Sequence, residues 1–251
     1  MSPEATEALL SKIGPIRHTH YGGFYDFTPD MAKADTAYTN IALPAHTDTT
    51  YFTDPAGLQA FHMLSHIAPQ GVDPADGNLG GQSLLVDGFH AAEMMRKQHP
   101  EAFEVLCSTG IPWHASGNEG IVIMPDRNYP VIEIAEGSKS IVSRIRWNNA
   151  DRGAVPHLSP KQVKEWYDAA RLYDGLLRHP DNEYWFQLQP GTILSKLVTG
   201  TDYGKLLTIL RHLVFDNWRV LHGRSEFQGI RRMCGGYSRL LVLTRLLTSL
   251  G

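Results

Sequence analysis

The chain has 251 residues, of which 42% are hydrophobic and 20% charged, and its formal net charge is -3. Such a length is sufficient for one large domain with a sizeable core, while the charge argues against binding to nucleic acid or to an anionic membrane surface. The two cysteines provide no disulfide framework, and no apolar run of about 18 residues is available to span a bilayer.

The predicted elements are mostly strands. In chain order we expect a helix over residues 2–13, strands at 41–52, 57–64 and 83–88, helices at 91–99 and 100–108, short strands within 119–147, a helix at 159–178 and a strand at 184–188. Many strands with few helices, and no alternation of strand and helix, predict a sandwich or jelly roll rather than a parallel sheet.

The stretch from Ala45 to Phe52 contains the first candidate site, a His-x-Asp pair. In an extended strand His46 and Asp48 point to the same side, so that both can reach one metal ion. An imidazole and a carboxylate are two of the three ligands of a non-haem Fe(II) facial triad. A packing histidine followed by a capping aspartate is the structural alternative.

The stretch from Phe215 to Arg224 contains the second candidate site. His222 lies on a short apolar strand just before a glycine, which suits a third metal ligand. Arg231 follows nine residues later, and Arg232 comes next. A guanidinium on the neighbouring strand would hold the carboxylate of a dicarboxylate co-substrate by two parallel hydrogen bonds.

Five stretches together resemble the Fe(II)/2-oxoglutarate hydroxylases of carnitine biosynthesis, the trimethyllysine dioxygenase and γ-butyrobetaine hydroxylase family. They are Asp35–Thr39, His46–Phe52, Leu84–Phe89, Trp147–Asn149 and Asp216–Arg224. The resemblance implies a mainly β fold with flanking helices, the double-stranded β-helix or jelly roll. It also implies hydroxylation of N6,N6,N6-trimethyllysine to 3-hydroxy-trimethyllysine, the first step of carnitine biosynthesis.

The resemblance also implies a role for each matching residue. His46, Asp48 and His222 would bind Fe(II), and Arg231 would hold the distal carboxylate of 2-oxoglutarate, with Arg232 as its neighbour and substitute. Ser83 would place a hydroxyl against the same co-substrate, although a turn serine gives the same pattern. Dioxygen is the second co-substrate, and ascorbate is expected as reductant.

Four tyrosines match the aromatic cage of this family: Tyr21, Tyr25, Tyr38 and Tyr237. A trimethylammonium group has no N–H donor, so a protein binds it through ring faces by cation–π attraction. Core packing is the alternative for each tyrosine taken singly. Relatives often have tryptophan at the position of Tyr25, and tyrosine there keeps an aromatic face that attracts a cation less strongly.

The other end of the substrate distinguishes the two reactions of the family. Trimethyllysine carries an α-ammonium and an α-carboxylate, whereas γ-butyrobetaine carries only a carboxylate. Asp35 would pair with the ammonium and repel a bare carboxylate, which favours trimethyllysine over the alternative of a γ-butyrobetaine hydroxylase. Asn148 is the matching residue for hydrogen bonding to the substrate carboxylate.

We expect a single catalytic jelly-roll domain over residues 1–251. Three departures from the family pattern lead us to expect that its stability and turnover are impaired. Ser195–Leu213 is an atypical insert, Ser238–Gly251 is an atypical tail, and the N-terminal domain and first strands of the family are expected to be missing. Two alternatives follow: a fragment that keeps only binding, and a sugar-binding or cupin-like jelly roll. We expect no targeting peptide, a cytoplasmic or mitochondrial matrix location, and a homodimer as one option.

Overall fold

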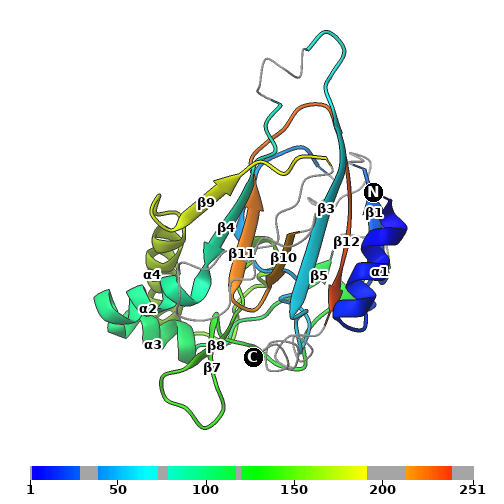
Figure 1. The fold of residues 1–251 in the computed structure, drawn as a ribbon. Helices are drawn as coiled ribbons and strands as arrows, with labels where there is room; N and C mark the ends of the chain where they lie inside the picture. The colour runs from blue at the N-terminus through cyan, green and yellow to red at the C-terminus, as the bar shows by residue number, and fades with distance from the viewer. Residues whose placement is uncertain (1, 29–38, 73–78, 117–119, 191–212, 239–251) are drawn as a thin grey trace, which may run out of the picture.

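Two four-stranded antiparallel sheets form the body of the protein in a computed structural model, which describes residues 2–28, 39–72, 79–116, 120–190 and 213–238 (Figure 1). The first sheet contains β1 (Phe24–Phe27), β12 (Ile230–Ser238), β3 (Leu58–Ile67) and β10 (Leu213–Asp216), in that order. The second sheet contains β2 (Leu43–His46), β11 (Val220–Arg224), β4 (Ser83–Asp87) and β9 (Glu183–Phe186), in that order. This arrangement confirms the predicted double-stranded β-helix.

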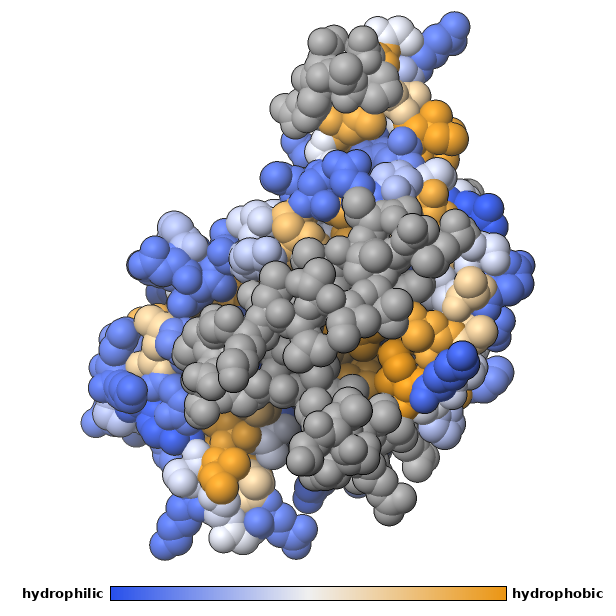
Figure 2. All heavy atoms as spheres, viewed as in Figure 1, coloured by the Kyte–Doolittle hydropathy of each residue, from blue (hydrophilic) through white to orange (hydrophobic). Residues whose placement is uncertain are grey.

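Three helices pack together at one end of the second sheet (Figure 1). They are α2 (Gly88–Gln98), α3 (Pro100–Ser108) and α4 (Pro160–Leu177). The side chain of Asp87 caps α2 by accepting hydrogen bonds from two backbone N–H groups, and Ser159 begins α4 with a capping box completed by Gln162. These helices bury Trp166 and Tyr173 in the larger hydrophobic core. Their solvent-facing side is mostly hydrophilic (Figure 2).

Two short two-stranded sheets and one 3-10 helix complete the described elements. The small sheets are β5 (Ala115–Ser116) with β6 (Val122–Ile123) and β7 (Ile132–Ile134) with β8 (Val142–Ile145), and the 3-10 helix is Asn149–Asp151. Among the described residues, no helix has the length and apolar character needed to cross a membrane.

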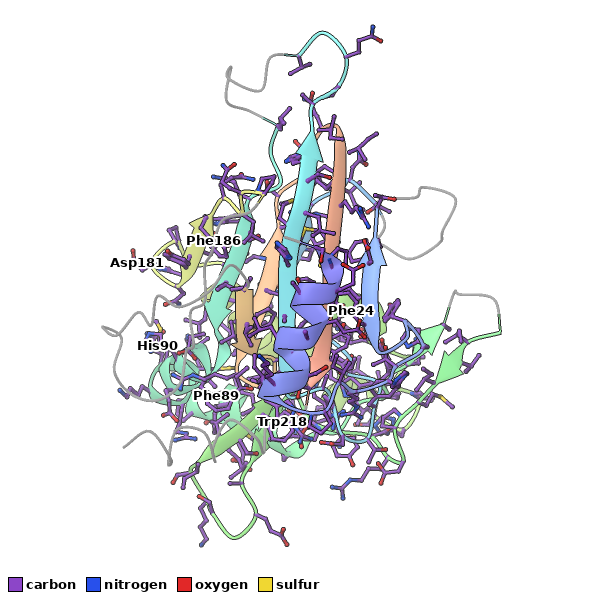
Figure 3. The ribbon with its side chains drawn as sticks, turned by 45° about the vertical axis from the view of Figure 1, so that its right-hand side comes forward. Phe24, Phe89, His90, Asp181, Phe186 and Trp218 are labelled. Carbon is purple, nitrogen blue, oxygen red and sulfur yellow. The ribbon has the colours of Figure 1, made fainter. Side chains whose placement is uncertain are left out.

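Helix α1 (Pro3–Ile13) covers the outer face of the first sheet (Figure 3). Thr6 is fully buried there, and its hydroxyl lies 2.8 Å from Nδ1 of His62 on β3. Cys234 on β12 is buried beside the same imidazole. Consecutive residues of β12 therefore face opposite ways: Cys234 lies under α1, whereas Met233 lies in a core between the two sheets.

Candidate active site

A cavity of about 290 Å³ lies between the two sheets. Its lining includes most of the residues that the sequence predicts for the site: Tyr21, Tyr25, His46, Asp48, Ser83, Asn148, His222, Arg231 and Tyr237. Asp35 and Tyr38 lie outside the described residues, so their predicted roles stay predictions. Both sheets contribute to the lining, because β2, β4 and β11 face β1, β3 and β12 across the cavity.

The two histidines of the predicted triad lie side by side on paired strands. His46 ends β2, and His222 on β11 is its direct cross-strand partner. Their ring centroids are 4.3 Å apart. One ligand atom from each of His46, Asp48 and His222 lies within 4.8 Å of the others, which is close enough for one metal ion. Phe61 and Phe215 of the first sheet pack against the ring of His222.

Asp48 reaches this group from a turn, and the predicted strand over residues 41–52 is therefore wrong beyond His46. Asn217 binds the backbone of Asp48 on both sides: Oδ1 accepts from the Asp48 N–H at 2.8 Å, and Nδ2 donates to the Asp48 carbonyl at 3.0 Å. The next residue, Thr49, has a φ of 58°. The chain thus reverses just after the carboxylate instead of continuing as a strand.

Protonation in the site suits a divalent cation. Nδ1 of His46 lies 2.8 Å from the Pro44 carbonyl and donates to it, so Nε2 keeps its lone pair and lies 3.3 Å from Oδ1 of Asp48. Burial and the neighbouring His46 lower the pKa of His222 to about 3, so His222 is neutral at neutral pH. Burial opposes ionisation of Asp48, but its contacts with both imidazoles and the hydrogen bond from the Tyr237 hydroxyl outweigh burial and lower its pKa. Two imidazoles and one carboxylate, converging in this form, fit Fe(II).

Arg231 provides a buried positive charge in the same cavity. Its side chain is 3% exposed, and its Nε and Nη1 have no hydrogen-bond partner within the described parts of the chain. Burial and the charge of Arg224 lower the pKa of Arg231 to about 10, so the guanidinium is protonated at neutral pH. Buried donors without partners are costly, and an anionic ligand would satisfy them.

The structure corrects two expectations about the arginines. Arg231 lies on β12 in the first sheet, so it faces His222 from the opposite sheet rather than from a strand paired with β11. Arg232 cannot substitute for it, because its guanidinium lies on the outer face and binds Asp26 through Nε at 2.9 Å and Nη2 at 2.6 Å. Neighbouring residues of a strand point to opposite faces, which accounts for the error.

Two further residues beside Arg231 shape the same part of the cavity. Ser83 on β4 is the cross-strand partner of Arg224 on β11, and both line the cavity. Arg224 donates to the carbonyls of Thr39 and Ile41, and burial lowers its pKa to about 10. Sequence reasoning assigned no role to Arg224, although its spacing of two from His222 on a strand indicates that both point to one face.

The described tyrosines of the predicted cage take different positions. Tyr25 and Tyr237 meet edge to face with ring centroids 5.8 Å apart, and the Tyr25 hydroxyl donates to the Ala60 carbonyl. The Tyr237 hydroxyl donates to Oδ2 of Asp48 at 2.7 Å. Tyr21 packs against His20 with ring centroids 3.9 Å apart. All three tyrosines line the cavity, whose surface there is aromatic.

Polar groups lie at another part of the lining. Asn148 precedes the 3-10 helix, and its Oδ1 accepts from the backbone of Ala150 at 3.0 Å. Asp151 also lines the cavity and accepts a 2.5 Å hydrogen bond from the Thr50 hydroxyl. A carboxylate at this position was not predicted, because Asp151 follows the Trp147–Asn149 motif and resembles an ordinary turn residue.

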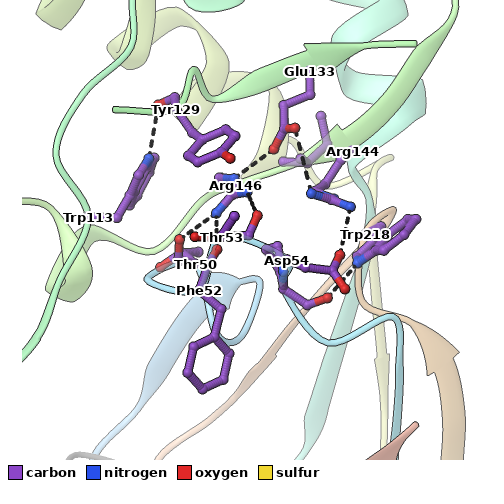
Figure 4. A network of polar contacts seen from close by, with 12 residues as sticks. Thr50, Phe52, Thr53, Asp54, Trp113, Tyr129, Glu133, Arg144, Arg146 and Trp218 are labelled. Carbon is purple, nitrogen blue, oxygen red and sulfur yellow. Dashed lines mark hydrogen bonds and ion pairs between the residues drawn. The ribbon is translucent and has the colours of Figure 1, made fainter. Parts of the chain in front are cut away.

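Arg146 holds the loop that follows Asp48 (Figure 4). This side chain is fully buried, and its guanidinium donates to Glu133 at 2.6 Å and to three backbone carbonyls, those of Thr50, Phe52 and Thr53. It also lies 3.9 Å from the centroid of the Tyr129 ring. A buried arginine bound to carbonyls of one loop acts as a rigid support for that loop.

Comparisons with known proteins agree with this geometry. Residues 1–195 match the family model described as taurine catabolism dioxygenase TauD, TfdA family. A trimethyllysine dioxygenase from Neurospora crassa is 52% identical over 94% of the chain and 50% of its own length, and a mitochondrial trimethyllysine dioxygenase from Homo sapiens is 39% identical over 93% and 49%. The chain thus spans about half the length of these relatives.

A solved structure supports the fold alone. PvcB, an Fe, alpha-ketoglutarate dependent oxygenase from an isonitrile synthetic pathway, superposes with a TM-score of 0.55 at 16% identity. The match covers 94% of this chain and 70% of that one. Identity at this level carries no information on the substrate, and the match therefore supports only the fold.

Proposed function

Because the chain belongs to the TauD/TfdA dioxygenase family, we propose that it carries out Fe(II)- and 2-oxoglutarate-dependent hydroxylation of N6,N6,N6-trimethyllysine at carbon 3. The observation that carries the proposal is the content of one cavity. The cavity is lined by three groups suited to an iron ion, by several tyrosine rings, and by a buried guanidinium whose Nε and Nη1 have no hydrogen-bond partner among the described residues. The names of the two relatives point to the same substrate.

His46, Asp48 and His222 would hold the iron, which when bound supplies the activation of dioxygen. The protein's contribution is to fix the three donors before the metal arrives. His46 is held in one tautomer by Pro44, and the Asp48 carboxylate is held by donors from the first sheet. The aromatic packing around His222 keeps water away from this side of the site.

Arg231 would bind the distal carboxylate of 2-oxoglutarate. Nη1 has no hydrogen-bond partner among the described residues and can donate, together with Nη2, two parallel hydrogen bonds to one carboxylate. Gly81 leaves the space for this side chain, because a Cβ there would come within 3.0 Å of Nη1. We propose Ser83 as a further hydrogen-bond donor to the co-substrate, since it lines the same cavity.

The tyrosine rings would bind the trimethylammonium group. Tyr21, Tyr25 and Tyr237 would present ring faces to a cation that cannot be hydrogen-bonded, and Tyr38 stays a predicted fourth member outside the described residues. Asn148 would bind the substrate carboxylate, since the Nδ2 group of its side chain is a donor. Asp35, also outside the described residues, stays the predicted partner of the α-ammonium.

The proposal is tested by turnover of the purified chain with Fe(II), 2-oxoglutarate and ascorbate. We expect succinate and a product with one added oxygen atom from trimethyllysine, and less of both from γ-butyrobetaine. Arg231→Leu should weaken 2-oxoglutarate binding by at least about tenfold, whereas Arg232→Leu, the matched control on the outer face, should leave it unchanged. Preference for γ-butyrobetaine, or equal effects of the two substitutions, would contradict the proposal.

The same turnover assay tests the expectation that the activity of this chain is impaired. Residues 195–212 of the predicted insert lie outside the described residues, and Leu213 begins β10. If 2-oxoglutarate and trimethyllysine bind but no succinate forms, the chain keeps only binding. The need for ascorbate, a homodimer, and a location in the cytoplasm or the mitochondrial matrix stay proposals; the name of the human relative favours the mitochondrion.

A further inference from the structure

A cross-strand pair in the first sheet holds one oxygen of the Asp48 carboxylate. Gln59 on β3 and Tyr237 on β12 are direct partners in the sheet, with exposed fractions of 1% and 5%. Gln59 donates from Nε2 to Oδ2 of Asp48 at 2.5 Å, and Tyr237 donates from its hydroxyl to the same oxygen at 2.7 Å. The Gln59 amide and the Tyr237 hydroxyl are themselves 3.5 Å apart.

These two donors fix the orientation of the Asp48 carboxylate towards the histidines. With Oδ2 hydrogen-bonded from the first sheet, Oδ1 lies 3.3 Å from Nε2 of His46, and Oδ2 lies 3.9 Å from Nε2 of His222. A carboxylate held at one oxygen cannot rotate freely, so both oxygens stay beside the imidazoles. Removal of a side chain that hydrogen-bonds to a metal ligand typically lowers the metal affinity by about ten- to a hundredfold.

Tyr237 also belongs to the aromatic lining. Its ring lines the cavity next to Tyr25, whose hydroxyl donates to the Ala60 carbonyl instead of to a metal ligand. Tyr237 therefore contacts both predicted sites at once, through its ring and through its hydroxyl. A ligand on the ring and a metal on Asp48 would each favour the same placement of this side chain.

We propose that Gln59 and Tyr237 are positioning residues for Asp48, and that Tyr237 couples the binding of a quaternary ammonium ion to the binding of the metal. This inference rests on the proposed function for the identity of both sites. A ligand that favours this placement of Tyr237, with its ring in the cavity and its hydroxyl on Asp48, presents the second ligand with the arrangement that it needs, so each should strengthen the other. Reciprocity requires the same coupling factor in both directions.

The test is a Co(II) titration of the metal-free full chain, followed by visible absorption, with tetramethylammonium chloride or with sodium chloride at equal ionic strength. Wild type should bind Co(II) more tightly in tetramethylammonium. Tyr237→Phe keeps the ring and should weaken Co(II) binding by about tenfold or more and abolish the coupling. Gln59→Met, which keeps the length of the side chain, should weaken Co(II) binding and retain coupling through Tyr237.

The matched control is Tyr173→Phe, which removes a buried hydroxyl bound to the Gly88 carbonyl away from the cavity. It should leave Co(II) affinity and coupling unchanged, and circular dichroism establishes that each variant is folded. Wild-type affinity and coupling in a folded Tyr237→Phe variant would overturn the inference. A wild-type chain that binds no Co(II) would overturn the proposed metal site, which is a different result.

Discussion

Arg146→Met should destabilise the protein by about 3–5 kcal/mol, the cost of removing one member of a buried ion pair. Methionine fills similar space but leaves the Glu133 carboxylate without its 2.6 Å partner, and Glu133 is only 18% exposed. It also leaves the carbonyls of Thr50, Phe52 and Thr53 without their donors. Methionine cannot replace any of these hydrogen bonds, so the loss should reach the upper part of this range.

Urea unfolding measures this loss as a shift in the midpoint at constant slope. The comparison is Arg144→Met on β8, two residues before Arg146. Arg144 pairs with Asp54, which is 56% exposed, and lies 3.7 Å from Glu133, a longer contact than the 2.6 Å bond of Arg146. Exposed pairs contribute about 0–1 kcal/mol. The double substitution Arg146→Met with Glu133→Gln should recover part of the loss, since it removes the unpaired buried charge.

The same substitution should also weaken metal binding, because the loop held by Arg146 begins two residues after Asp48. We expect Co(II) affinity to fall in Arg146→Met and to remain near wild type in Arg144→Met. A loss of stability below about 1 kcal/mol for Arg146→Met, similar to a surface pair, would refute the reasoning that this network supports the loop.

Three further outcomes are expected. Gly81→Ala should weaken 2-oxoglutarate binding, because its Cβ would crowd the Arg231 guanidinium, whereas Gly71→Ala, with a similar positive φ and open space around it, should not. The metal-free protein should lose stability in urea as the pH falls from about 6.5 towards 3, because His222 takes up a proton only when unfolded in that range, and His222→Asn should flatten this dependence. Cys234, whose pKa burial raises to about 11, should react with iodoacetamide only after unfolding.

The local sequence pattern was sufficient to predict many of the helices and strands. Helix starts at Pro3, Pro100 and Ser159 were predictable because proline and capping side chains act on their nearest neighbours. The helix expected from Ala91 begins earlier, at Gly88, since Asp87 caps it as soon as β4 ends. Strand positions were predictable from apolar runs, but the partners of these strands were not.

Site residues could be predicted where the residue type alone identifies them. The prediction failed where the role of a residue depends on which strands pair and in which register. A buried guanidinium near the metal ligands was expected, yet choosing between Arg231 and Arg232 requires the register of β12 against β3. Gln59 and Asn217 were missed because an amide has no distinctive spacing from the ligand it supports. Each becomes recognisable only when strands far apart in sequence are brought together.

Thr49 explains why the second half of the His-x-Asp stretch was mispredicted. Its left-handed backbone costs a β-branched residue about 1–3 kcal/mol, so an isolated peptide of this sequence would favour the extended strand. In the protein the Thr49 hydroxyl accepts from the Ala56 N–H at 2.8 Å and its carbonyl accepts from the Phe52 N–H at 3.0 Å. Together with Asn217 and Arg146, these bonds outweigh the strain and turn the Asp48 carboxylate towards the two imidazoles. The position of the third ligand group is therefore a property of contacts made by residues some 100 to 170 positions away.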